Sequence, residues 1–133
     1  MTGFQMLALV LLFATKHMIV DFFLQTPKMV EEKSNFFKIG GYVHAAQHGL
    51  ATMIILDPWV KGPLYILFAP FLIDFLCHYL IDWSKMNLGK KFNLTPSDKV
   101  FWDLIGVDQW LHFVTYIFIL WYINCLPIEL LSL

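Results

Sequence analysis

Residues 3–25 read GFQMLALVLLFATKHMIVDFFLQ, an apolar stretch that carries His17 and Asp21 near its end. About 20 apolar residues in an α-helix, at roughly 1.5 Å each, cross the hydrocarbon core of a bilayer. Residues four positions apart lie on one face of a helix, so the two polar side chains can reach the same point. The stretch therefore predicts a membrane helix with a polar site near one end.

The whole chain has the composition of an integral membrane protein. Its 133 residues are 59% hydrophobic and 14% charged, and the mean hydropathy is +0.65. Apolar segments at 3–25, 40–56, 63–83 and 104–126 predict four membrane helices, of which the one at 40–56 is the shortest. We expect an all-α fold, with residues 1–133 forming a single transmembrane domain built as an antiparallel four-helix bundle.

The first segment has no basic start and no small-residue cleavage site, so we expect it to remain as a membrane helix. The net charge of −1, together with the lack of a basic run, predicts no nucleic-acid partner.

Lysines are sorted between the two sides of this predicted bundle. The loops after the first and third segments carry Lys28, Lys33, Lys38, Lys85, Lys90, Lys91 and Lys99, whereas the opposite side carries Lys61. By the positive-inside rule, the lysine-rich loops face the cytoplasm, and both termini lie on the periplasmic side of a bacterial inner membrane. Residues 26–39 and 98–106 mix charged and apolar side chains, which predicts short amphipathic helices at the cytoplasmic surface.

Every histidine lies four residues from another histidine or from an aspartate. The pairs are His17 with Asp21, His44 with His48, His78 with Asp82, and Asp108 with His112. All four pairs fall in the cytoplasmic half of the predicted bundle, which puts eight potential ligands in one layer. One such pair is typical of a hydrogen bond between helices, but four pairs at one depth favour a metal site.

The ligand types limit which metals would suit this site. Imidazole and carboxylate without a well-placed thiolate suit zinc, iron or manganese better than Cu(I) or an iron–sulfur cluster. We expect one or two divalent ions, with zinc ranked first. The glutamate of an H-E-x-x-H zinc protease is missing from residues 44–48 (HAAQH), and Gln47 stands between the two histidines. Cys77 and Cys125 are predicted to be packing residues.

Roles in catalysis can be assigned as hypotheses. Asp108, Asp82 and Asp21 are the candidate catalytic residues, one of them acting as general base for a metal-bound water. Lys85 follows the face of His78 and Asp82, so it can hold an anionic group such as phosphate, or simply extend to the membrane interface. The predicted substrate contacts are Lys85, Gln25 and Gln109. Asp74 is expected to support the site from deeper in the bundle, and Lys16 to reach an interface or pair with an acid.

Four strings carry a resemblance to a known family. They are residues 17–25 (HMIVDFFLQ), residues 44–48 (HAAQH), residues 78–85 (HYLIDWSK) and residues 108–112 (DQWLH). In this order they resemble the motifs of a family of small, uncharacterised integral membrane proteins from bacteria and their phages. A looser likeness, in size and in histidine-bearing helices, is to predicted membrane-bound metal-dependent hydrolases. The resemblances imply a membrane location and functional weight for these residues.

The leading hypothesis is a metal-dependent hydrolase that acts at the cytoplasmic leaflet on a lipid-like or phosphorylated substrate. One alternative is a di-iron membrane oxygenase, although the His-His doublets usual in those enzymes are missing. Another is a protein without enzymatic activity, either a metal or proton carrier or a phage factor that acts on a host partner. The bilayer is an expected partner in each case, and a homo-oligomer would be compatible with all of them.

Overall fold

The computed structural model describes residues 1–131 and consists of helices joined by short connections. The helices are α1 (Gly3–Ile19), α2 (Pro27–Glu32), α3 (Ile39–Leu56), α4 (Tyr65–Lys91) and α5 (Lys99–Asn124). A π-helical turn, Val20–Leu24, continues α1, and short 3₁₀ turns follow α3 and α5 at Asp57–Trp59 and Ile128–Leu130. The predicted all-α fold is confirmed.

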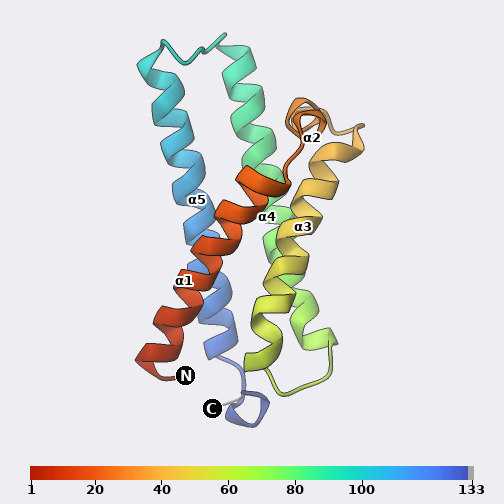
Figure 1. The fold of residues 1–133 in the computed structure, drawn as a ribbon, viewed down its shortest axis with the longest axis vertical. Helices are drawn as coiled ribbons and strands as arrows, with labels where there is room; N and C mark the ends of the chain where they lie inside the picture. The colour runs from red at the N-terminus through yellow and green to blue at the C-terminus, as the bar shows by residue number, and fades with distance from the viewer. Residues whose placement is uncertain (132–133) are drawn as a thin grey trace.

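The four long helices run alternately in opposite directions (Figure 1). Helix α3 packs against α4, α4 packs against α5, and α1 contacts both α3 and α5, which closes the ring. The N terminus and the connection from α3 to α4 lie at one end, called here the termini end. Helix α2 and the turn between α4 and α5 lie at the other, called the lysine-rich end. The arrangement agrees with the predicted antiparallel order of the segments.

Three helical segments are long and apolar enough to cross a membrane. They are Gly3–Leu24, Tyr65–Lys91 and Lys99–Asn124. Helix α3 is the predicted fourth span, but it does not join this set. It has 18 residues, and Gly40, Gly41, His44 and His48 all lie on its buried face. These glycines and histidines lower the mean hydropathy of α3. They face the interior of the bundle, where polar side chains are tolerated better than on a lipid-facing surface.

Two helices extend beyond the predicted segments. Helix α4 ends at Lys91 where the prediction ended at residue 83, and α5 starts at Lys99 and absorbs the separate helix predicted at 98–106. The apolar pattern marks only the part of a helix that needs an apolar environment. Backbone hydrogen bonding continues through good helix formers such as Lys85, Met86 and Leu88. The short amphipathic helix predicted within 26–39 is present as α2.

Asp98 is the N-cap of α5 and holds the preceding turn. Its carboxylate accepts hydrogen bonds from the backbone N–H of Thr95 at 2.7 Å and from the Thr95 hydroxyl at 2.8 Å. The hydrogen bond from the Thr95 backbone, and after it the one from the Thr95 hydroxyl, lower the pKa of Asp98. The carboxylate therefore stays charged at the start of the helix, where the helix dipole also stabilises a negative charge.

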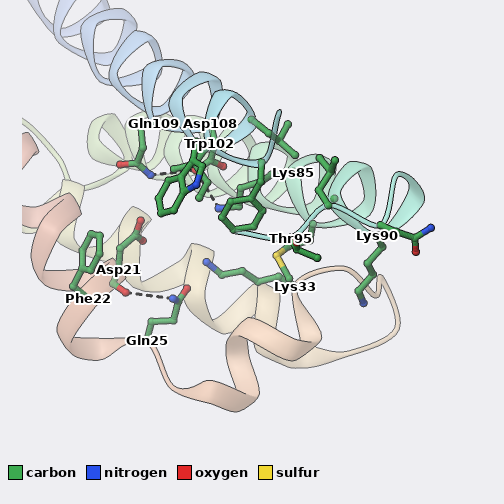
Figure 2. A pocket seen from close by; sticks show the side chains of 17 residues that line it. Asp21, Phe22, Gln25, Lys33, Lys85, Lys90, Thr95, Trp102, Asp108 and Gln109 are labelled. Carbon is green, nitrogen blue, oxygen red and sulfur yellow. Dashed lines mark hydrogen bonds and ion pairs between the residues drawn. The ribbon is translucent and has the colours of Figure 1, made fainter. Parts of the chain in front are cut away.

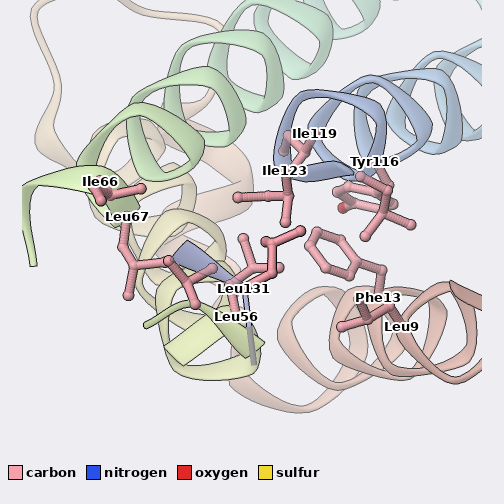
Figure 3. Close-up of a cluster of buried hydrophobic side chains, with 11 residues drawn as sticks. Leu9, Phe13, Leu56, Ile66, Leu67, Tyr116, Ile119, Ile123 and Leu131 are labelled. Atoms are coloured by element: carbon pink, nitrogen blue, oxygen red, sulfur yellow. The ribbon is translucent and has the colours of Figure 1, made fainter. Parts of the chain in front are cut away.

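The apolar core fills the termini end (Figure 3). It contains Leu9, Phe13, Leu56, Val60, Ile66, Leu67, Tyr116, Ile119, Leu120, Ile123 and Leu131. An antiparallel bridge between Val60 and Leu131 ties the chain after α5 to the chain after α3. Because the apolar side chains are concentrated at this end, the buried polar side chains fall together in the other half of the bundle.

Candidate metal centre

The π-helical turn after α1 places Asp21 at the centre of the polar site. Turns of this type are rare and often occur at functional positions. Asp21 Oδ1 lies 3.0 Å from His48 Nε2 and 3.1 Å from His44 Nε2, both on α3. Its other oxygen, Oδ2, lies 3.2 Å from His17 Nε2. One carboxylate therefore joins the histidines of two helices.

His78 completes a first group of potential ligands from three chain segments. Its Nε2 lies 3.1 Å from His44 Nε2 and 3.8 Å from Asp21 Oδ1. Ligand atoms of Asp21, His44, His48 and His78 all lie within 4.8 Å of one another. In a tetrahedral zinc site with bonds of roughly 2.0–2.1 Å, neighbouring ligand atoms are about 3.3 Å apart. The observed separations bracket that value, so the group can hold a metal ion.

A second group shares His78 and brings in α5. It consists of His78, Asp82 and His112. Asp82 Oδ2 lies 3.3 Å from His78 Nε2, and Asp82 Oδ1 lies 3.9 Å from His112 Nε2. One ring nitrogen of a neutral imidazole binds one ion. The two groups therefore suit either one ion bound by a subset of the six residues or two ions that divide them.

Stacking orients the histidine rings. The His48 and His78 rings stack with centroids 3.5 Å apart, and His112 stacks on His78 at 4.1 Å. The Nδ1 atoms of His44, His48 and His78 have no hydrogen-bond partner within the described part of the chain. Metal-binding histidines usually donate a hydrogen bond from the nitrogen that does not bind the metal. Here ring packing takes over part of that orienting role.

Two predicted ligands lie beside these groups. His17 Nδ1 is 2.8 Å from the Tyr116 hydroxyl, and His17 Nε2 is 3.0 Å from Gln109 Oε1. Asp108 Oδ1 is 3.6 Å from His112 Nε2, and its Oδ2 accepts a hydrogen bond from Gln109 Nε2 at 3.1 Å. The structure therefore gathers all eight residues of the four pairs, six of them in the two potential metal-binding groups.

Lysines balance the negative charge of the aspartates, both beside the histidines and nearer the apolar core. Lys33 Nζ lies 2.6 Å from Asp82 Oδ2, and Lys85 Nζ lies 3.1 Å from both Asp82 Oδ1 and Asp108 Oδ2. Closer to the apolar core, Lys16 pairs with Asp74. Such pairing is required because an isolated charge buried away from water is costly.

Sequence reasoning missed two of these side chains. Lys33 lies in a charged segment and carries no local signal of its burial. Tyr116 could have been found, because it follows His112 by four residues and so shares its helix face. For Lys16, the structure selects the predicted pairing with an acid rather than an interfacial position, and that acid is Asp74.

A cavity of about 980 Å³ opens beside the potential metal-binding groups at the lysine-rich end (Figure 2). Its polar wall includes Asp21, Asp108, Lys33 and all three predicted substrate contacts, Gln25, Lys85 and Gln109. Its apolar wall includes Phe22, Met86, Leu94, Phe101, Trp102, Leu104 and Ile105. Asp21 thus belongs both to a potential metal-binding group and to the wall of a cavity large enough for a substrate.

A family model described as "Protein of unknown function (DUF3307)" matches residues 7–131. This match covers nearly all of the chain and agrees with the uncharacterised status of the family expected from the four strings. No curated protein and no solved structure matches the chain. Evidence on function therefore comes from the buried histidines and aspartates and from the cavity beside them.

Proposed function

The chain belongs to the DUF3307 family, whose description assigns no activity, and from its polar site we propose that it is a membrane-embedded metal-dependent hydrolase. The observation that carries the proposal is the double position of Asp21, in a potential metal-binding group and in the cavity wall. A metal ion held there would face a substrate bound in the cavity. Such contact is the minimum that metal-assisted hydrolysis requires.

The donor set ranks the metals for this proposal. Three imidazoles and one carboxylate around one point suit zinc, with iron or manganese as alternatives. A divalent ion in this position would supply an acidified water and polarise a phosphoryl or carbonyl oxygen. The rest of the chemistry falls to the surrounding side chains.

Asp108 is the strongest candidate for the general base. It lines the cavity but stands outside both potential metal-binding groups, and its Oδ1 accepts no hydrogen bond within the described part of the chain, so that oxygen could take a proton. Lys85 and Gln109 both donate hydrogen bonds to Asp108 Oδ2, which fixes its orientation. Asp21 and Asp82, the other two catalytic candidates, would bind the ion and orient the histidines.

The cavity favours a substrate that is both anionic and apolar. Lys33, Lys85 and Lys90 line it together with aromatic and aliphatic side chains. Lysine binds phosphate as a point charge, and the apolar wall suits a lipid-like portion. Under the positive-inside rule, the cavity would open at the cytoplasmic leaflet.

Elemental analysis tests the metal. Protein purified in mild detergent should contain about one or two equivalents of zinc, iron or manganese. The His44→Ala/His48→Ala variant should lose it, because both imidazoles leave the first group. Gln47→Ala is the matched control on the same helix and should retain the metal. A folded wild-type protein without metal after growth and purification with added zinc, iron and manganese would contradict the proposal.

Hydrolysis is tested separately with alkyl para-nitrophenyl phosphate. Wild type should release nitrophenol, and Asp108→Asn should keep its metal but lose about 100-fold or more in rate, the usual size of a general-base contribution. Equal rates in both proteins would remove Asp108 from the reaction. Iron in the site with an oxygen-dependent optical change, and no hydrolysis, would instead indicate an oxygenase.

A further inference from the structure

A smaller cavity of about 220 Å³ lies between α4 and α5. It is lined by Leu80, Ile81, Ser84, Lys85, Leu88, Leu104, Val107, Asp108 and Leu111. Lys85, Leu104 and Asp108 also line the large cavity. The two cavities therefore meet at the ion pair between Lys85 and Asp108, whose atoms are 3.1 Å apart.

The smaller cavity, called here the α4–α5 groove, is apolar apart from Ser84 and this ion pair. Both helices that form it are long and apolar enough to cross a membrane. Leu80, Leu88 and Val107 on its rim are 50%, 42% and 53% exposed. In a bilayer such side chains face lipid, so the groove would open sideways toward the hydrocarbon region.

The charges inside the site predict what the head of a bound molecule should carry. The site contains three lysines and four aspartates, namely Lys16, Lys33 and Lys85 with Asp21, Asp74, Asp82 and Asp108. With neutral imidazoles this set has one excess negative charge. One divalent ion would turn the excess into one positive charge, which favours an anionic group on a bound ligand.

We propose that the protein binds an amphiphile with an anionic phosphate group, whose phosphate reaches Lys85 in the large cavity while its alkyl chain lies in the α4–α5 groove. The proposal rests on the proposed function only for the metal ion that leaves the site positively charged. It adds an entry route, because the chain would pass from the bilayer between α4 and α5 without leaving an apolar environment.

Fluorescence quenching tests the binding without any need for turnover. The probe is 2-bromoundecyl phosphate, added to metal-loaded protein in nanodiscs of phosphatidylcholine. Its bromine lies next to the phosphate end of the chain, so it would enter the large cavity with the phosphate, and bromine quenches nearby tryptophan. Trp102 lines the large cavity, so quenching should saturate in wild type and should be much weaker in Trp102→Phe. Lys85→Met should weaken binding about tenfold or more, since it removes the charge nearest the phosphate.

A matched pair of valines on α5 tests the groove. Val107 lines it, whereas Val114, two turns further on and 44% exposed, does not. Val107→Phe should fill the groove and weaken binding about fivefold or more, and Val114→Phe should leave it unchanged. Either variant can be checked for folding through its retained metal.

Two further probes identify what is recognised. Neutral 2-bromoundecanol should quench without saturation, and inorganic phosphate should compete only weakly. Equal saturable quenching by the alcohol would overturn the role of the phosphate, and equal affinity for inorganic phosphate would overturn the role of the chain. Saturable binding without hydrolysis would contradict the proposed function and support this inference. Hydrolysis that is unaffected by Val107→Phe would support the proposed function and contradict this inference.

Discussion

Lys16 and Asp74 form the deepest charged contact of the site, between the histidines and the apolar core. Lys16 Nζ also donates to the Thr52 hydroxyl at 2.9 Å and to the backbone carbonyl of His48 at 3.1 Å. The Thr52 hydroxyl in turn donates to Asp74 at 2.5 Å. Lys16 is on α1, Thr52 on α3 and Asp74 on α4, so this small network fixes three helices at one depth.

Removing one partner of this pair should destabilise the protein. Lys16→Met leaves Asp74 buried with only the Thr52 hydroxyl as donor, and we expect a loss of about 3–5 kcal/mol. Lys16→Met/Asp74→Leu removes both charges and should recover most of that loss. The measurement is reversible unfolding in mixed micelles. A double variant no more stable than the single would argue against the ion pair as the cause.

At the residue scale, spacing predicted partners within a helix but not partners across the fold. The four-residue separation predicted that His17 and Asp21 would act together, and their atoms are 3.2 Å apart. It could not predict that Lys33 would fold back onto Asp82, because that contact depends on the path of the chain through α2. Long flexible side chains in charged segments give no periodic signal of their own burial.

At the scale of elements, one glycine sets the distance between α3 and α4. A Cβ on Gly49 would lie 2.9 Å from the backbone oxygen of Phe71 and 2.7 Å from its ring. Small residues at helix crossings allow backbones to approach closely in membrane proteins. This close approach brings His48 on α3 against His78 on α4, so the geometry of the potential metal-binding groups depends on it.

Gly49→Ala should therefore push the two helices apart. We expect a loss of about 1–3 kcal/mol from overpacking, together with weaker metal retention. Gly106→Ala is the control, because a Cβ there meets nothing within 4 Å. It should stabilise α5 by about 0.5–1 kcal/mol through the lower entropy of the unfolded chain. Unfolding and metal content measured on both variants check this, and equal behaviour would rule out a special role for Gly49.

The existence and order of the helices could be predicted from apolar runs, but two local features could not. Helix α4 continues to Lys91 because a helix needs no apolar side chains to keep its hydrogen bonds. The π-helical turn at Val20–Leu24 contains Asp21, which contacts His44 and His48 on another helix. Neither the extra length nor the wider turn leaves a hydrophobic pattern that sequence reasoning can detect.

At the scale of the whole molecule, charge is distributed unevenly between the two ends. The lysine-rich end carries seven of the nine lysines, in the segment between α1 and α3 and at the adjoining ends of α4 and α5, and the termini end carries Lys61. The N terminus and the connection from α3 to α4 lie together at that end (Figure 1). The positive-inside rule therefore predicts that the lysine-rich end of the bundle faces the cytoplasm.

Cysteine labelling in intact bacterial cells tests this orientation. In a Cys77→Ala/Cys125→Ala background, Asp57→Cys should react with a membrane-impermeant maleimide because it lies at the termini end. Ser97→Cys should react only after the cells are opened, because it lies at the lysine-rich end. Both positions are exposed, so differences in burial do not explain the result. The reverse labelling pattern would contradict this orientation and would place the large cavity on the periplasmic side of the membrane.

The apolar core at the termini end also limits the routes by which ions and water can reach the polar site. Leu9, Phe13, Leu56 and Ile119 are almost completely inaccessible, and they close the bundle on that side of the polar site. Ions and water would then reach the polar site through the large cavity, which is also where the phosphate of a bound amphiphile would lie. An amphiphile bound in the large cavity would block this route. A chelator should therefore remove the metal more slowly from protein with bound amphiphile than from protein without it.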